Sequence, residues 1–312
     1  MDFAKSRPWF FLLSALIILP GVVFLILSPG LKPGIDFTGG SSLTVQFPEL
    51  AKVNQESIRT ELAKIGYEDA KIQNFEIIEA EGEKYETFFL RTQTLNEEQK
   101  DLLVESLNNA FSPNETDTLQ SFDLVSAVVA EETVINALWA VLAAAVGIFF
   151  YIWWAFRNVP SPFRYGLAAI VALLHDTLIV VGIFSILGYL FEIEVNTMFL
   201  IALLTVIGYS VNDTIVVFDK IRENVLIYSN RPFPEIVNLS ISETIGRSLN
   251  TSFTLLITLL ALLMFGGATI REFLYVLIIG VLAGTYSSIA IATQVLVSWN
   301  QKSLGRFIQS KN

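Results

Sequence analysis

The sequence predicts a polytopic α-helical membrane protein with one α+β domain outside its membrane spans. The chain has 312 residues, of which 53% are hydrophobic, and a mean hydropathy of +0.57, so it is more apolar than a usual soluble domain. Its apolar runs are long enough to cross a bilayer as helices. The net charge of −10 is uneven, because residues 28–135 hold 20 acidic and 8 basic side chains. The acidic charge therefore belongs to one polar segment near the N-terminus.

Composition excludes several classes of function. The chain has no cysteine, which excludes disulfides, thiolate metal sites and cysteine nucleophiles. Its single histidine, His175, leaves almost no basis for a histidine metal site or a serine-type triad. The acidity of the polar segment argues against nucleic acid as a partner. We therefore expect no cofactor, no metal and no catalytic residues, and we interpret the chain as a protein other than an enzyme.

Residues 9–27 are expected to form the first span, after a short cytoplasmic N-terminus at 1–8. The basic residues Lys5 and Arg7 precede this apolar run. The run is longer than the hydrophobic part of a typical signal peptide, and no cleavage site of the A-x-A kind follows it. We therefore interpret it as an uncleaved signal anchor.

Residues 28–135 are expected to form an extracytoplasmic domain with the order βαββαβ, the ferredoxin-like arrangement. Apolar residues at alternating positions predict strands, and apolar residues at helical spacing predict helices. The expected strands are 41–47, 70–78, 85–92 and 122–129, and the expected helices are 55–65 and 97–111.

The motif GIDFTGG, at 34–40, precedes the first expected strand. Its paired glycines predict a tight bend or a close backbone approach. A phosphate-binding loop is the other interpretation, but the Walker lysine and the helix that such a loop requires are missing.

Five further spans follow the polar domain. They are expected at 136–156, 165–187, 197–218, 248–265 and 272–297. Basic residues lie in the loop after the second span, in the loop at 219–247 and in the tail at 298–312, whereas the loop after the third span has two acids and no base. The positive-inside rule therefore places both termini in the cytoplasm and the 28–135 domain outside.

The fourth span contains an acid, Asp213, and an ionisable residue inside a span is a functional candidate by default. Thr205, Tyr209, Asn212 and Asp213 share one helix face, and Gly208 lies on the same side. One interpretation is a proton-binding carboxylate on an ion path, with Asn212 beside it. The other is a structural acid near the helix end that snorkels or pairs.

Two further groups are candidates for the same path. Arg247 begins the fifth span, and because spans four and five run antiparallel, it is expected at a depth similar to that of Asp213. Arg247 is either the counter-charge that sets the protonation of Asp213 or a snorkelling side chain at the interface. His175 and Asp176 lie near the middle of the third span, where they form either part of a proton relay or a structural hydrogen-bonded pair.

Small residues recur at helical spacing in the last span. Gly280, Gly284 and Ser288 are four residues apart, a pattern that permits close helix packing. Gly208 offers a similar close approach on the fourth span. The pattern in the last span leaves open whether it packs within the chain's own bundle or against a partner subunit.

These motifs together resemble the SecD/SecF family of protein-export membrane proteins. The resemblance covers nearly the whole chain, and its motifs occur in the expected order. They are GIDFTGG (34–40), ALLHDTLIVVGIFS (172–185), TVIGYSVNDTIVVFDKIREN (205–224), GRSLNTSFTLL (246–256), FGG (265–267) and the Gly280/Gly284 pattern.

The resemblance implies a six-helix half of a twelve-helix unit of the RND superfamily, completed by SecD. It implies a place in the bacterial plasma membrane beside the SecYEG translocon and SecA, with YajC and YidC as further possible partners. Proton motive force would promote the translocation of an unfolded exported polypeptide. The resemblance implicates Asp213 and Arg247 in proton passage and adds the pair His175 and Asp176. Sodium coupling stays open.

Two other functions compete with this interpretation. An RND-type exporter of small molecules or lipids usually has two large outside domains, and this chain has one small one. A non-conducting scaffold for translocon assembly is the second alternative. It predicts that Asp213 can be replaced without loss of function.

Overall fold

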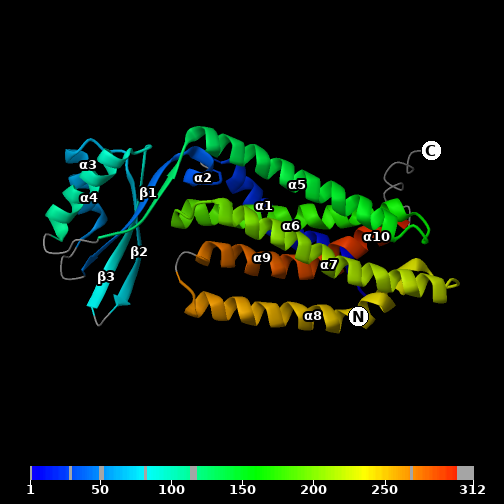
Figure 1. Ribbon diagram of the computed structural model, residues 1–312. Coiled ribbons are helices and arrows are strands. Elements are labelled where there is room, and N and C mark those ends of the chain that lie inside the picture. Colours follow the sequence, from blue (N-terminus) through cyan, green and yellow to red (C-terminus); the bar gives the residue numbers. More distant parts are fainter. Residues whose placement is uncertain are drawn as a thin grey trace. The chain divides into compact units, whose positions relative to one another are not determined.

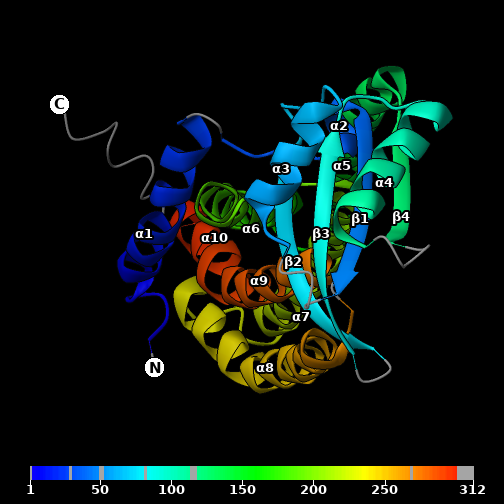
Figure 2. The same cartoon turned by 90° about the vertical axis from the view of Figure 1, so that its left-hand side faces the viewer.

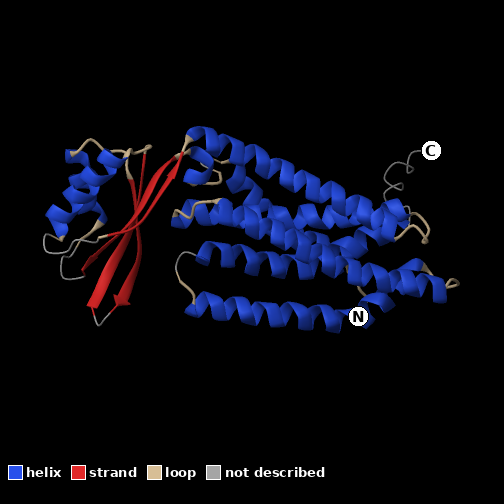
Figure 3. Cartoon of the chain, viewed as in Figure 1, coloured by secondary structure: helices blue, strands red, loops and turns tan. Residues whose placement is uncertain are grey.

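The computed structural model describes residues 2–27, 30–48, 53–80, 83–112, 118–267 and 270–300. The chain divides into two compact units, one comprising Met1–Lys32 with Leu138–Asn312 and the other Pro33–Ala137. Figure 3 shows that the strands gather in one part of the chain, whereas the long helices make up the other.

The unit Pro33–Ala137 contains a four-stranded antiparallel sheet with the strand order β2-β3-β1-β4. Helices α3 and α4 lie on one face of this sheet (Figure 2). This topology is the ferredoxin-like arrangement that the sequence predicts. The elements are α2 (Ile35–Thr38), β1 (Gly40–Pro48), α3 (Gln55–Lys64), β2 (Lys71–Ala80), β3 (Glu83–Thr92), α4 (Glu97–Phe111) and β4 (Leu119–Val125).

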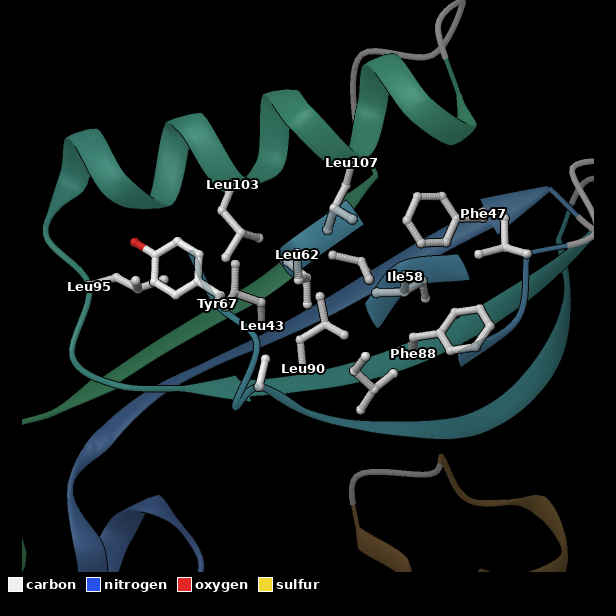
Figure 4. Close-up of a cluster of buried hydrophobic side chains, with 14 residues drawn as sticks. Leu43, Phe47, Ile58, Leu62, Tyr67, Phe88, Leu90, Leu95, Leu103 and Leu107 are labelled. Carbon is white, nitrogen blue, oxygen red and sulfur yellow. The ribbon is translucent and has the colours of Figure 1, made fainter. Parts of the chain in front are cut away.

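The core of this unit lies between the sheet and its two helices (Figure 4). Alternate residues of β1, such as Leu43 and Phe47, point toward Leu103 and Leu107 of α4, and all four are fully buried. Each buried side chain of this size stabilises the fold by about 1.5–3 kcal/mol. Capping boxes at Asn54 and Asn96 start α3 and α4, because each asparagine side chain accepts a backbone N–H of the first turn.

The last expected strand, 122–129, is wrong at its C-terminal end. Strand β4 ends at Val125, and helix α5 (Ala127–Ala155) begins two residues later. The hydroxyl of Ser126 accepts the backbone N–H of Val129 at 3.3 Å, and its carbonyl accepts that of Ala130. Ser126 is thus the N-cap of a helix, and the apolar residues after it belong to that helix.

The paired glycines make the close backbone approaches that their pattern predicts. Both have positive φ angles, +73° at Gly39 and +126° at Gly40. A Cβ atom on Gly40 would lie 2.7 Å from the carbonyl oxygen of Thr92, and one on Gly39 would lie 3.1 Å from the Cα of Ala127. A single helical turn, α2, fills the residues before them. Side chains at these positions would therefore force neighbouring backbone apart.

The other unit is a bundle of long helices, several of which run side by side (Figure 1). Among the described residues, six helices are long and apolar enough to cross a membrane, as predicted. The last of them contains a short π-helical stretch, η3. The elements are α1 (Arg7–Ile26), α5 (Ala127–Ala155), α6 (Pro162–Phe191), α7 (Thr197–Ile227), α8 (Phe233–Phe265), α9 (Arg271–Ser287), η3 (Ser288–Ala292) and α10 (Thr293–Asn300).

The segment 219–247, expected as a loop, is helical except at its centre. Helix α7 continues to Ile227 and α8 begins at Phe233, so only a short turn joins them. The amide of Asn224 donates to the Ser240 hydroxyl at 3.0 Å and to the Glu243 carboxylate at 2.9 Å. The bond to Ser240 is buried and the bond to Glu243 is partly buried, and the two hold the helices together beyond the apolar part of each.

Candidate functional site

Asp213 lies on the side of α7 that faces α8, and its side chain is only 5% exposed. The hydroxyl of Ser248, on α8, lies next to the carboxyl but outside hydrogen-bond geometry. Asp213 Oδ2 and Ser248 Oγ are therefore both buried without a hydrogen-bond partner among the described residues. A buried polar atom of this kind is costly and calls for a physical explanation. A carboxylate oxygen with no donor is available to a proton or another cation.

A ladder of hydroxyl groups continues from this site between α7, α8 and α9. Tyr209, one turn from Asp213, contacts the Ser252 hydroxyl at 2.9 Å. Ser252, one turn from Ser248, also contacts the Thr285 hydroxyl at 2.5 Å. Hydroxyl groups both donate and accept, so this ladder joins three helices through groups that can pass a proton.

Arg247 points away from Asp213. It is exposed on the surface of α8, and no ion pair involves it in the described part of the chain. Adjacent residues on a helix point about 100° apart, so Ser248 rather than Arg247 faces the acid. Asn212 is likewise exposed on α7. Arg247 and Asn212 thus flank the contact between α7 and α8 on its exposed side.

More polar residues belong to this exposed surface, which we call the α7–α8 polar surface. They share helical spacing with Asn212 on α7 and with Arg247 on α8. Gly208 also lies there, and a Cβ atom on it would meet nothing within 4 Å, so no described helix approaches it closely. The polar surface comprises Thr205, Asn212, Arg247, Asn250, Thr251, Thr254 and Thr258.

A second buried network surrounds the pair on α6. The Nδ1 atom of His175 lies 2.9 Å from Asp176 Oδ1. The other carboxylate oxygen, Oδ2, accepts the hydroxyls of Ser210 on α7 at 2.5 Å and of Ser287 on α9 at 2.7 Å. Asp176 is 2% exposed and both of its oxygens are hydrogen bonded. Its environment is therefore the opposite of that of Asp213.

The same network reaches α1 through the histidine. His175 Nε2 lies 2.9 Å from the hydroxyl of Ser14, which is 3.3 Å from the hydroxyl of Tyr286. The Tyr286 hydroxyl donates to the backbone carbonyl of Phe10 at 2.7 Å, and its ring stacks on that of His175. One chain of polar groups thus links α1, α6 and α9.

Four members of this network were not predicted from the sequence: Ser14, Ser210, Ser287 and Tyr286. Each lies in an apolar span, where a polar group must find a partner on another helix. Ser14, in the middle of the first span, carries that signal most clearly. Its partner depends on which helices pack against each other, and helical spacing within one span does not predict that packing.

The small residues of the last span pack within the chain itself. A Cβ atom on Gly280 would overlap the side chain of Val206, and one on Gly284 would lie 2.8 Å from the Cβ of Ser210. Val206 and Ser210 both belong to α7, so the two glycines bring α9 close to that helix. The close approach also brings Ser210 and Ser287 to the same carboxylate oxygen.

The π-helical stretch η3 begins at the residue after Ser287, the α9 serine that donates to Asp176. Its first residue, Ser288, contacts the Thr214 hydroxyl on α7 at 2.9 Å. A π-helical turn inside an α-helix changes the direction of the residues that follow it, and such turns are frequent at functional sites. Here the turn follows directly on the serine that donates to Asp176.

Six membrane helices with two buried acids, joined to a small α+β unit, define a polytopic membrane protein of the transport class. Residues 104–302 match the family described as protein export membrane protein SecD/SecF, C-terminal, and residues 24–47 match the SecD/SecF GG motif. The chain therefore belongs to the SecD/SecF family of protein-export membrane proteins, and its curated relatives are SecF subunits. Its role is that of a translocase subunit of the Sec pathway.

Two of these relatives are similar over nearly their full length. The chain is 44% identical to the protein translocase subunit SecF of Thermobaculum terrenum, covering 99% of this chain and 97% of that protein. It is 40% identical to SecF of Anaerolinea thermophila, covering 96% and 94%. The match to the GG motif includes Gly39 and Gly40, which both have positive φ angles.

A solved structure is similar as well. The crystal structure of SecDF in its super-membrane-facing form shares 31% identity, with a TM-score of 0.66. The match covers 99% of this chain and 40% of the SecDF chain, so the chain corresponds to less than half of that protein.

Proposed function

We propose that the chain pairs with a SecD subunit and uses the proton motive force to promote protein translocation. This proposal is carried by Asp213 Oδ2, which is buried next to a polar surface and has no hydrogen-bond partner among the described residues. An arginine or asparagine in contact with hydrocarbon is costly. A partner subunit that covers Asn212 and Arg247 removes this cost and places its own groups beside Asp213.

The site then lies between two subunits, as binding sites in transporters often lie between structural repeats. The similar solved structure is of SecDF, and this chain matches 40% of it, which supports SecD as the partner. Arg247 would interact with Asp213, or with an acid of SecD, once the surface is covered. His175 and Asp176 form a second polar site in the same bundle.

The proposed setting is the bacterial plasma membrane, beside the SecYEG channel and SecA, with YajC and YidC as further partners. Both termini lie in the cytoplasm and the unit Pro33–Ala137 lies outside, as the basic loops indicate. The outside unit would contact the exported polypeptide as it emerges.

The partner is tested by photocrosslinking from the polar surface. Because the chain has no cysteine, an Asn250→Cys variant carries a photoreactive label at one position only. We expect crosslinks from Asn250→Cys to SecD in membranes that contain both subunits. A Leu12→Cys variant, exposed on α1, is the matched control and should give a much weaker SecD product. Crosslinks from position 250 to lipid alone would contradict the proposal.

Ion coupling is tested by export into inverted membrane vesicles at a fixed ATP concentration. We expect the stimulation that the chain provides to disappear when a protonophore collapses the proton gradient. A sodium ionophore should leave it unchanged, and vesicles without the chain supply the baseline. Loss with the sodium ionophore alone would indicate sodium coupling. Stimulation that survives both would support the scaffold instead.

A further inference from the structure

The network around His175 has a hydrogen-bond direction that is fixed at its Tyr286 end. At one end the backbone carbonyl of Phe10 can only accept, so the Tyr286 hydroxyl must donate to it. The Tyr286 oxygen is then free to accept the hydroxyl proton of Ser14. At the other end Asp176 Oδ2 accepts from two serine hydroxyls, and Asp176 Oδ1 contacts His175 Nδ1.

The Ser14 hydroxyl has one proton and two neighbours, His175 Nε2 and the Tyr286 hydroxyl. It can donate to the Tyr286 oxygen or to His175 Nε2, but it cannot donate to both. With a neutral imidazole that donates from Nδ1 to Asp176, one of these two contacts lacks a hydrogen. With a second proton on Nε2, His175 donates to Ser14, Ser14 donates to Tyr286, and every contact is satisfied.

We propose that His175 is a proton-binding site within the membrane helices, with Asp176 as its fixed counter-ion and Ser14 and Tyr286 as its acceptor chain. Binding of the proton completes the polar contact between α1, α6 and α9. Loss of the proton turns the Ser14 hydroxyl toward His175 and leaves the Tyr286 oxygen without its donor. The site therefore couples proton occupancy to the attachment of α1.

The surroundings of the imidazole are consistent with this role. The titratable groups that face His175 are Asp176 on its own helix and Tyr286 on α9. Helices α1 and α7 contribute hydroxyl groups, those of Ser14 and Ser210. Ser14, His175 and Asp176 are each more than nine-tenths buried, so solvent does not compete for these bonds.

The proposal deepens the proton-coupled function of the preceding section by adding a proton site, yet its test does not depend on export. His175 is the single histidine of the chain, so a sample with ¹⁵N-labelled histidine gives the signals of one imidazole. We would record the ¹⁵N shifts of Nδ1 and Nε2 in the full chain in lipid nanodiscs, across roughly pH 5–8, where histidine titrates.

We expect a neutral form protonated on Nδ1 and, on acidification, an imidazolium protonated on both nitrogens. Hydrogen bonds to charged groups contribute enough that Ser14→Ala should move this transition about one to two units toward lower pH. Tyr286→Phe keeps the stacked ring and should give a smaller shift in the same direction. It also serves as a second test where Ser14→Ala fails to fold.

A neutral form protonated on Nε2 would place the proton on Asp176 and overturn the proposal. Identical transitions in the wild type and both variants would also overturn it. Asp213→Asn is the matched control, because it lies outside this network and should leave the histidine signals unchanged. A normal histidine transition combined with export that ignores the proton gradient would reject the proposed function while this site stands.

Discussion

Replacing Asp213 by asparagine should reduce export to the level of cells that lack the chain. Asparagine keeps the size of the side chain but removes the group that can bind and release a proton. The wild-type carboxylate has a buried oxygen, Oδ2, that meets no donor in the described part of the chain, and the substitution deletes that acceptor for protons. Because no hydrogen bond to this oxygen is lost, we expect the variant to fold and to reach normal membrane levels.

The measurement is export of a secreted reporter in cells depleted of their own SecF, at matched levels of each variant. Asp219→Asn is the control on the same helix, since Asp219 is exposed and pairs with Arg222 at 2.5 Å. An exposed pair contributes at most about 1 kcal/mol, so this variant should export normally. Normal export by Asp213→Asn would mean that Asp213 is structural, and the scaffold function would then be favoured.

The fold was largely predictable because its signals are local and periodic. Six apolar runs predict the six membrane helices. Alternating apolar residues predict the strands, and apolar residues at helical spacing predict the helices, of the order βαββαβ. The start of α5 was missed because the apolar residues after Ser126 fit a strand as well as a helix. The serine cap decides between them, and that cap depends on a side chain turning back onto the first turn.

The site was predictable in its acids but not in their partners. An acid in a span stands out in any sequence, so Asp213 and Asp176 were both found. Depth along the span placed Arg247 near Asp213, but a difference of one residue rotates a helix by about 100°, and Ser248 faces the acid instead. The contact from His175 to Ser14 joins residues 161 positions apart, and it depends on how α1 packs against α6.

That packing depends on two glycines at the crossing of α1 and α6. A Cβ atom on Gly21 would lie 2.6 Å from the Cα of Gly182, and one on Gly182 would lie 2.9 Å from the Cα of Gly21. Two glycines permit the backbones to touch, which brings Ser14 within reach of His175, two helical turns away. Neither glycine belongs to a repeated small-residue motif on its own helix. The crossing needs both glycines together, so no pattern within one helix predicts it.

Replacing Asp176 by alanine should destabilise the helix bundle far more than any substitution of Asp213. Alanine removes the acceptor of three donors, His175, Ser210 and Ser287, all buried between helices. Leaving a buried donor without its acceptor costs about 1–3 kcal/mol for each group, because that group stays desolvated and unpaired. The expected result is a large loss of thermal stability for the full chain in lipid nanodiscs.

The size of the loss should follow the number of bonds removed. Asp176→Asn keeps an oxygen for His175 and offers an amide to the two serines, which can accept, so its loss should be smaller. Ser287→Ala removes one bond, and an interhelical hydrogen bond within a membrane contributes about 0.6 kcal/mol on average. Asp213→Asn, with no such bond to Oδ2, should unfold close to the wild type.

The expected stabilities distinguish Asp176, whose carboxylate has three donors, from Asp213, whose Oδ2 atom has none among the described residues. An Asp176→Ala variant as stable as the wild type would show that the three donors find other partners, and the fixed charge that we assign to Asp176 would be wrong. A strong loss in Asp176→Ala beside an unchanged Asp213→Asn would mean that one carboxylate holds the helices together. The other, whose buried oxygen has no donor, is then free to exchange a proton during transport.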